Sequence, residues 1–167
     1  FLYLKEGVEP EPLINGGTGE LETVLEIPDR LESGTMNTPG VGGLSAGVEF
    51  LLEETVEKIR AREEMLLSVL LEGLSAIGNI KIIGPAEASK RAALIAFNIE
   101  GRRPAEVGMA LDEGYGIMVR CGAHCAPEAH REAGTAPDGA VRVSPGYFTA
   151  EEEIEEFLRA VRAIAAK

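Results

Sequence analysis

The sequence has little of several residue types that mark particular protein classes. Its 167 residues include two cysteines, two histidines and no tryptophan. Two cysteines four residues apart, Cys121 and Cys125, cannot form the disulfide framework of a small secreted domain. No apolar run approaches the roughly 18 residues that a membrane-spanning helix needs, and the N-terminus becomes charged too early for a signal peptide. We therefore expect a cytoplasmic protein with no membrane partner.

Basic residues are also scarce. Lysine and arginine together number 16 against 28 acidic residues, which gives a net charge of −12. Nucleic acids bind clustered basic side chains, so this balance argues against a nucleic-acid partner. The run of glutamates at 151–156 is typical of a solvated helix face. Apolar residues make up 45% of the chain, enough to form a core.

The N-terminal half predicts a strand, turns and a long helix. Residues 1–4 favour a short strand, and residues 15–19 and 31–38 favour irregular, glycine-containing stretches. An apolar period of three to four residues then runs from Thr38 to about Ile77, a helical segment long enough to be kinked or to bridge two lobes. We expect residues 1–38 to be the end of a large domain and residues 79–167 to form a C-terminal small domain. Residues 39–78 would be the helical segment that connects the two.

The remainder alternates strands and helices. We expect strands at 80–83, 93–99, 117–120 and 141–144 and a short helix at 104–113. A last helix opens with a capping box of Thr149 and Glu152. The predicted fold is an α+β lobe of the α/β class, a few-stranded sheet backed by helices.

The chain's reactive side chains gather at residues 119–130, a predicted loop at the end of a strand. This segment holds both cysteines and both histidines. A thiol there can act as a nucleophile if positive charge stabilises its thiolate, and the nearby candidates are Arg120, His124, His130 and Arg131. A metal site made by Cys121, Cys125 and His130 is an alternative, although no second ligand pair exists. The other alternative is that both cysteines are buried apolar groups and both histidines are structural.

Two arginines sit beside predicted strands. Arg142 lies between Val141 and Val143, so its side chain should face the opposite way from theirs. A guanidinium fork suits a carboxylate, and an internal salt bridge is the alternative. Arg120 has a similar setting. The glycine-rich stretches at 16–19 and 33–35 could bind a phosphate through backbone N–H groups, or could simply be turns.

In order along the chain, these segments resemble the class V aminotransferases. The motifs are Gly-Gly-Thr-Gly at 16–19, Glu-Ser-Gly-Thr-Met-Asn-Thr-Pro at 32–39, Arg-x-Gly-x-His-Cys-Ala at 120–126 and Val-Arg-x-Ser at 141–144. The resemblance is to the C-terminal portion of the cysteine desulfurase and selenocysteine lyase branch, and it covers essentially the whole chain. It implies part of a fold-type I transferase that uses pyridoxal 5′-phosphate (PLP).

The resemblance assigns roles to particular residues. It implies that Cys125 is the nucleophile that takes sulfur from L-cysteine as a persulfide and leaves L-alanine, with His124 beside it. Arg142 would bind the substrate carboxylate, and Arg120 would be a second active-site arginine. Thr35, with Gly34, would reach the PLP phosphate of the other subunit of a homodimer. No role is implied for Cys121, and no metal.

The resemblance also implies that these 167 residues lack the lysine that binds PLP. The family's Schiff-base lysine would lie just before Phe1, so we expect the 167 residues alone to be inactive. The full-length enzyme would pass sulfur to an acceptor protein, for example for iron–sulfur cluster assembly. The alternatives are a selenocysteine lyase, another class V lyase or transaminase, or a non-catalytic fragment that dimerises or docks a partner.

Overall fold

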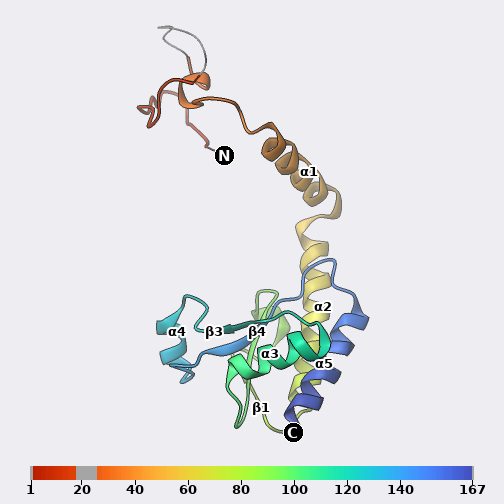
Figure 1. Ribbon diagram of the computed structural model, residues 1–167. Coiled ribbons are helices and arrows are strands. Elements are labelled where there is room, and N and C mark those ends of the chain that lie inside the picture. The colour runs from red at the N-terminus through yellow and green to blue at the C-terminus, as the bar shows by residue number, and fades with distance from the viewer. Residues whose placement is uncertain (1, 18–25, 167) are drawn as a thin grey trace. The chain divides into compact units, whose positions relative to one another are not determined.

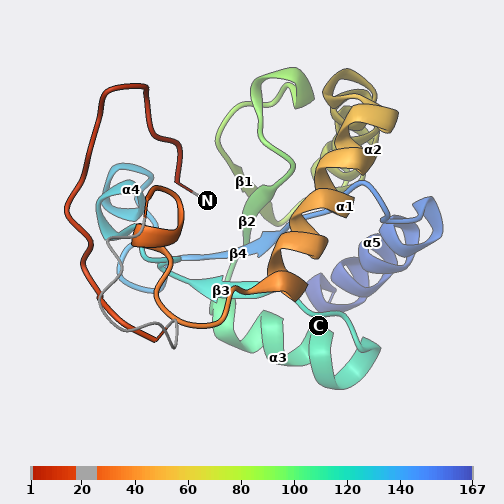
Figure 2. The same ribbon diagram turned by 90° about the horizontal axis from the view of Figure 1, so that it is seen from above.

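The computed structural model describes residues 2–17 and 26–166 and divides into two compact units, Phe1–Glu53 and Glu54–Lys167. The second unit contains the sheet (Figures 1 and 2). Within its described residues the strands are β1 (Ile80–Ile83), β2 (Ile95–Ile99), β3 (Arg120–Gly122) and β4 (Ala140–Val143). Their spatial order is β1-β2-β4-β3, and every neighbouring pair is antiparallel.

One face of this sheet is apolar because side chains alternate along each strand. In β2, Ile95, Phe97 and Ile99 are buried while the residues between them are less so. Phe97 pairs with Val141, which puts Val141 on the same buried face. The neighbouring pair, Ala96 and Arg142, therefore lies on the opposite face, as the strand pattern predicted for Arg142.

Three helices cover the apolar face: α2 (Val56–Ser75), α3 (Pro104–Tyr115) and α5 (Glu151–Ala165). Each contributes buried side chains at helical spacing, and Phe157 of α5 packs edge-to-face on Phe97 with ring centroids 6.1 Å apart. The helical part of the core consists of Leu66, Leu67, Leu70, Leu74, Val107, Leu111, Ile154, Phe157, Val161 and Ile164. The predicted sheet backed by helices is confirmed.

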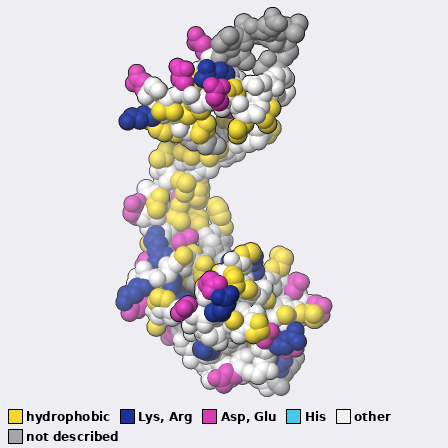
Figure 3. Space-filling model, turned by 90° about the vertical axis from the view of Figure 1, so that its left-hand side faces the viewer, with side chains coloured by type: hydrophobic (Ala, Val, Ile, Leu, Met, Phe, Trp, Pro, Cys, Tyr) yellow, Lys and Arg dark blue, Asp and Glu magenta, His cyan; other side chains and the backbone are white. Residues whose placement is uncertain are grey.

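The predicted long helical segment is two helices. α1 (Thr38–Glu54) ends where Thr55 adopts φ 66° and ψ 144°, and the Thr55 hydroxyl then accepts a hydrogen bond from the Lys58 amide at 3.4 Å, which caps α2. Within the described residues no α1 side chain is buried. Five large apolar side chains of α1 are between 45% and 76% exposed. They are Val41, Leu44, Val48, Leu51 and Leu52. Exposed apolar side chains are yellow in Figure 3. Among the described residues, no helix is both long and apolar enough to cross a membrane.

Some predicted strand boundaries are wrong. Residues 2–4 form no strand, because no described residue of the chain pairs with them; Phe1 lies outside the described residues. The strand predicted at 117–120 starts at Arg120 instead, since the Ile117 amide donates to Leu111 O at 3.0 Å and so completes the end of α3. The strands expected at 93–99 and 141–144 are Ile95–Ile99 and Ala140–Val143.

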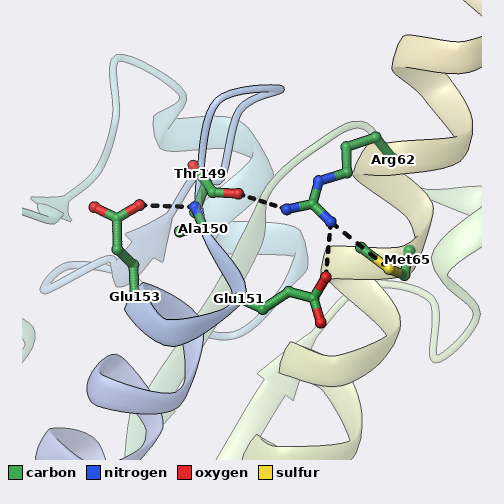
Figure 4. Close-up of polar contacts among 6 residues, drawn as sticks. All are labelled: Arg62, Met65, Thr149, Ala150, Glu151 and Glu153. Atoms are coloured by element: carbon green, nitrogen blue, oxygen red, sulfur yellow. Dashed lines mark hydrogen bonds and ion pairs between the residues drawn. The ribbon is translucent and has the colours of Figure 1, made fainter.

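The predicted capping box of α5 is also wrong. Glu153, not Glu152, accepts from the backbone N–H of Ala150, at 2.8 Å (Figure 4). The Thr149 hydroxyl instead accepts from the Gly146 amide at 2.9 Å, in the turn before the helix. This turn is tied to α2, because the Arg62 guanidinium donates to Thr149 O at 3.0 Å and to Glu151 at 2.9 Å.

Candidate active site

Two arginines face each other across the β3–β4 pair. Arg120 is the direct partner of Arg142, and directly paired residues point to the same side of a sheet. That side is opposite to the buried Val141. Two like charges at this spacing repel unless an anion lies between or beside them, so this surface favours a negatively charged ligand.

The charge of Arg142 is not paired with any acidic side chain in the part of the chain that the structure describes. Among the described residues it takes part in no ion pair, and its Nε is buried without a hydrogen-bond acceptor. The internal salt bridge that the sequence left open is therefore not formed within the part of the chain that the structure describes. A buried donor without an acceptor is costly, and a carboxylate is the group whose two oxygens match a guanidinium fork.

The turn after β3 brings the predicted nucleophile back to this surface. His124 and Cys125 have positive φ values of 52° and 59°, and the Ala126 amide closes the turn by donating to Ala123 O at 2.8 Å. As a result Cys125 Sγ lies 3.7 Å from Arg120 Nη2. Cys125 is exposed, so its thiol is open to a reactant. Arg120 is therefore the cationic side chain that contacts the predicted nucleophile.

His124 lies beside the thiol as a neutral imidazole. Its Nε2 is 3.1 Å from the carbonyl oxygen of Arg120, which makes Nε2 the protonated nitrogen. Burial lowers the pKa of His124 first of all, the hydrogen bond to the Arg120 carbonyl opposes this, and the nearby Arg142 and Arg120 side chains lower it further. His124 therefore does not supply the positive charge, and Arg131 is engaged with Glu128. Of the four candidates, Arg120 is the one whose charged group contacts the thiol.

Cys121 lies outside this site. It pairs with Val141 and packs against the core, and a Cβ added to Gly108 would come within 2.5 Å of its sulfur. Burial raises its pKa, so it behaves as a small apolar residue. The described residues contain no group of three or more His, Cys, Asp or Glu side chains that could hold a metal ion.

The two glycine-rich stretches of the first unit lie against each other. A Cβ on Gly17 would approach Gly34 Cα to 3.0 Å, and the Ser33 hydroxyl donates to Gly16 O at 2.7 Å. Thr35 follows this contact and is exposed. The hydroxyl of Thr35 is therefore open to a ligand. Thr18 and Gly19, part of the same predicted motif, lie outside the described residues.

Part of the predicted loop is helical, which the sequence analysis missed. Helix α4 (Pro127–Glu132) begins at a proline in its first turn and carries His130. His130 is buried, and its Nδ1 lies 2.7 Å from the hydroxyl of Thr135. Thr135 was not among the candidate residues, because a single threonine after a glycine carries no recognisable sequence signal.

The chain belongs to the class V aminotransferase family, whose model matches residues 1–157. It is 36% identical over 152 residues to a probable cysteine desulfurase of Pyrococcus abyssi and 33% identical over 173 residues to a cysteine desulfurase of Salmonella agona. These alignments cover 88% and 98% of the chain but 37% and 41% of the relatives, so the chain spans about two-fifths of their length.

Solved structures give the same result. The apo cysteine desulfurase of Thermococcus onnurineus matches 93% of the chain and 39% of its own length, with a TM-score of 0.79 and 34% identity. The cysteine desulfurase CsdA of Escherichia coli, in an S-sulfonic acid form, matches with a TM-score of 0.73 and 26% identity over 93% of this chain and 39% of that one. The predicted family and fold class are confirmed.

Proposed function

We propose that this chain is the C-terminal part of a PLP-dependent cysteine desulfurase in which Cys125 accepts the sulfur. The single observation that carries the proposal is the 3.7 Å contact between Cys125 Sγ and Arg120 Nη2, next to Arg142, which forms no ion pair with any described residue. A sulfur nucleophile and a carboxylate-binding group beside each other suit an amino-acid substrate that carries sulfur. The names of the relatives point to the same reaction.

PLP, when bound, supplies the electron sink that makes the C–S bond of the substrate breakable. The residues of this chain do the rest. Arg142 binds the substrate α-carboxylate, and the Arg120 guanidinium contacts the Cys125 sulfur and orients it. The thiolate attacks the substrate sulfur, an S–S bond forms and the substrate C–S bond breaks. The electron pair of the broken bond stays with the substrate carbon, which takes up a proton and leaves as L-alanine.

His124 is suited to a proton-transfer role in this scheme. Because its pKa is lowered, it is uncharged at neutral pH and can accept a proton from the thiol of an incoming substrate. It then loses that proton readily. This role needs a neutral imidazole near the nucleophile, and the hydrogen bond to Arg120 O holds the ring in place.

We further propose that the enzyme is a homodimer in which Thr35 and Gly34 bind the PLP phosphate, and that a sulfur-acceptor protein takes the persulfide sulfur. The close packing of the two glycine-rich turns supports the phosphate role. The Schiff-base lysine would be supplied by a part of the enzyme that precedes these residues, and the 167 residues by themselves would bind no cofactor covalently and would not turn over substrate.

The test is Cys125→Ala in the full-length enzyme, with Cys121→Ala as the matched control. Cys125→Ala should abolish both persulfide on the protein and alanine production from L-cysteine, while the visible absorbance of bound PLP persists. Cys121→Ala should keep the activity, since Cys121 lies in the core face of β3. Alanine production at the wild-type rate by Cys125→Ala would remove Cys125 from the role proposed here. Running the same assay with L-selenocysteine identifies a selenocysteine lyase, which would release selenium without needing Cys125.

A further inference from the structure

A buried polar pair lies behind the cysteine turn and has no role in the scheme above. His130 of α4 and Thr135, which follows that helix, are each only 8% exposed. His130 Nδ1 and Thr135 Oγ1 are 2.7 Å apart. Buried polar groups of this kind are kept in a fold when their hydrogen bonds fix something that apolar packing would leave free.

The hydrogen bonds assign the protons of this pair. The Thr135 hydroxyl has one proton and donates it to the carbonyl oxygen of His130 at 3.3 Å. In the 2.7 Å contact His130 Nδ1–H must therefore be the donor and Thr135 Oγ1 the acceptor. The same carbonyl also accepts from the backbone amides of Thr135 and Ala136, at 2.8 and 3.1 Å. His130 is thus fixed in both ring orientation and backbone position.

This fixed residue touches the cysteine turn on both sides of the nucleophile. Its ring packs on the ring of His124, with centroids 5.5 Å apart, and its backbone amide donates to Ala126 O at 3.2 Å. Cys125 lies between those two contacts. His124 and Cys125 both have positive φ, which disfavours any residue with a side chain unless its surroundings hold it there.

We propose that His130 and Thr135 are positioning residues, which hold the positive-φ turn so that the Cys125 thiol stays beside the Arg120 guanidinium. The inference rests on the proposed function, in which Cys125 is the nucleophile. In this proposal His130 contacts neither the substrate nor the cofactor. Removing the Thr135 hydroxyl should reduce the reactivity of Cys125 even when the fold is intact.

The test is the rate at which iodoacetamide alkylates each cysteine of the full chain at neutral pH, followed by mass spectrometry, with Cys121 as an internal reporter of the folded core. The matched variants are Thr135→Val, which keeps the volume and removes the hydroxyl, and Thr135→Ser, which keeps the hydroxyl and removes a methyl group. We expect Thr135→Val to slow Cys125 alkylation by about threefold, the size of one partly screened charge contact. Thr135→Ser should leave the rate within about 1.5-fold of wild type, since the hydroxyl remains.

The comparison of the two variants separates positioning from stability. An unchanged or faster Cys125 rate in Thr135→Val, or an equal loss in Thr135→Ser, overturns the proposal. If Thr135→Val makes Cys121 reactive, the core has opened, and His130→Phe decides instead, because it keeps a ring against His124 but cannot donate to Thr135. If that variant also opens the core, the pair supports the whole fold and the proposal is overturned. Alkylation needs no PLP or turnover, so a failure here leaves the desulfurase test with Cys125→Ala unaffected.

Discussion

Replacing Gly139 by alanine tests whether the approach of β3 to β4 is as close as the structure indicates. Gly139 is buried just before β4, with φ +78°, and a Cβ there would lie 2.1 Å from the carbonyl carbon and oxygen of Gly122. Its amide donates to Thr135 O at 2.7 Å and its carbonyl accepts from Asn98 at 3.0 Å, so the backbone cannot simply rotate away. The Gly122 end of β3 must move instead.

Two effects should lower the free energy of unfolding in Gly139→Ala. A positive φ costs an alanine about 1 kcal/mol. Overpacking against backbone that is held in a sheet adds about 2 kcal/mol. The matched control is Gly134→Ala, where φ is +67° and nothing lies within 4 Å of the added Cβ, so only the first effect applies.

Urea denaturation of both variants and of wild type measures the difference. We expect Gly139→Ala to lower the free energy of unfolding by about 3 kcal/mol and Gly134→Ala by about 1 kcal/mol. Because Gly122 leads into the cysteine turn, Gly139→Ala should also slow Cys125 alkylation. If the two variants unfold within about 0.5 kcal/mol of each other, a spread that ordinary surface substitutions already show, the close approach of the strands is refuted.

Three further outcomes can be checked. In the full-length enzyme Arg142→Lys should raise KM for L-cysteine by about tenfold or more, because an ammonium cannot replace the two parallel hydrogen bonds of a guanidinium, and an unchanged KM excludes Arg142 as the carboxylate-binding group. Since the pKa of His124 is lowered by folding, the unfolded chain binds that proton more readily, so His124 reduces stability as the pH falls through about 6.5. Urea unfolding at acid and neutral pH should therefore show that the free energy of unfolding falls less on acidification in His124→Asn than in wild type. Asparagine is chosen because its side chain tolerates positive φ. An equal fall in both proteins contradicts the lowered pKa of His124. Arg62→Ala should destabilise the chain by about 1 kcal/mol in a thermal or urea melt and Glu151→Gln by much less, because the exposed ion pair contributes little beside the Arg62 hydrogen bond to Thr149 O, and equal effects contradict this ranking.

The sequence predicted the core of the second unit well because its apolar periodicity is strong. The α5 stripe of Ile154, Phe157 and Val161 is buried as expected, and so are the alternating residues of β2. The direction of Arg142 followed from its two apolar neighbours alone. Strand boundaries were less predictable, because Ile117 has the side chain of a strand residue but its amide is used by the end of α3.

Local features without periodicity could not be predicted. The break at Thr55 contains neither proline nor glycine, so the helical pattern continues through it. The predicted strand at residues 1–4 depends on a partner strand, and sequence alone cannot say whether one is present. At the site, the motif predicted Cys125, His124 and Arg120 together, but it could not show that Arg120 rather than His124 contacts the thiol, since that depends on the positive-φ turn. The roles predicted for Thr35 and Gly34, in the other unit, stay predictions.

The placement of the two cysteines on opposite sides of β3 keeps their thiols apart. Cys121 is packed in the core with Val141, while Cys125 lies beside Arg120 on the other face. Joining their sulfurs would require withdrawing Cys121 from the core and breaking the β3–β4 pairing. Under the proposed function, this separation would keep a persulfide on Cys125 from reacting with the Cys121 thiol to form an internal disulfide. The outer sulfur of such a persulfide would then go to an acceptor other than Cys121.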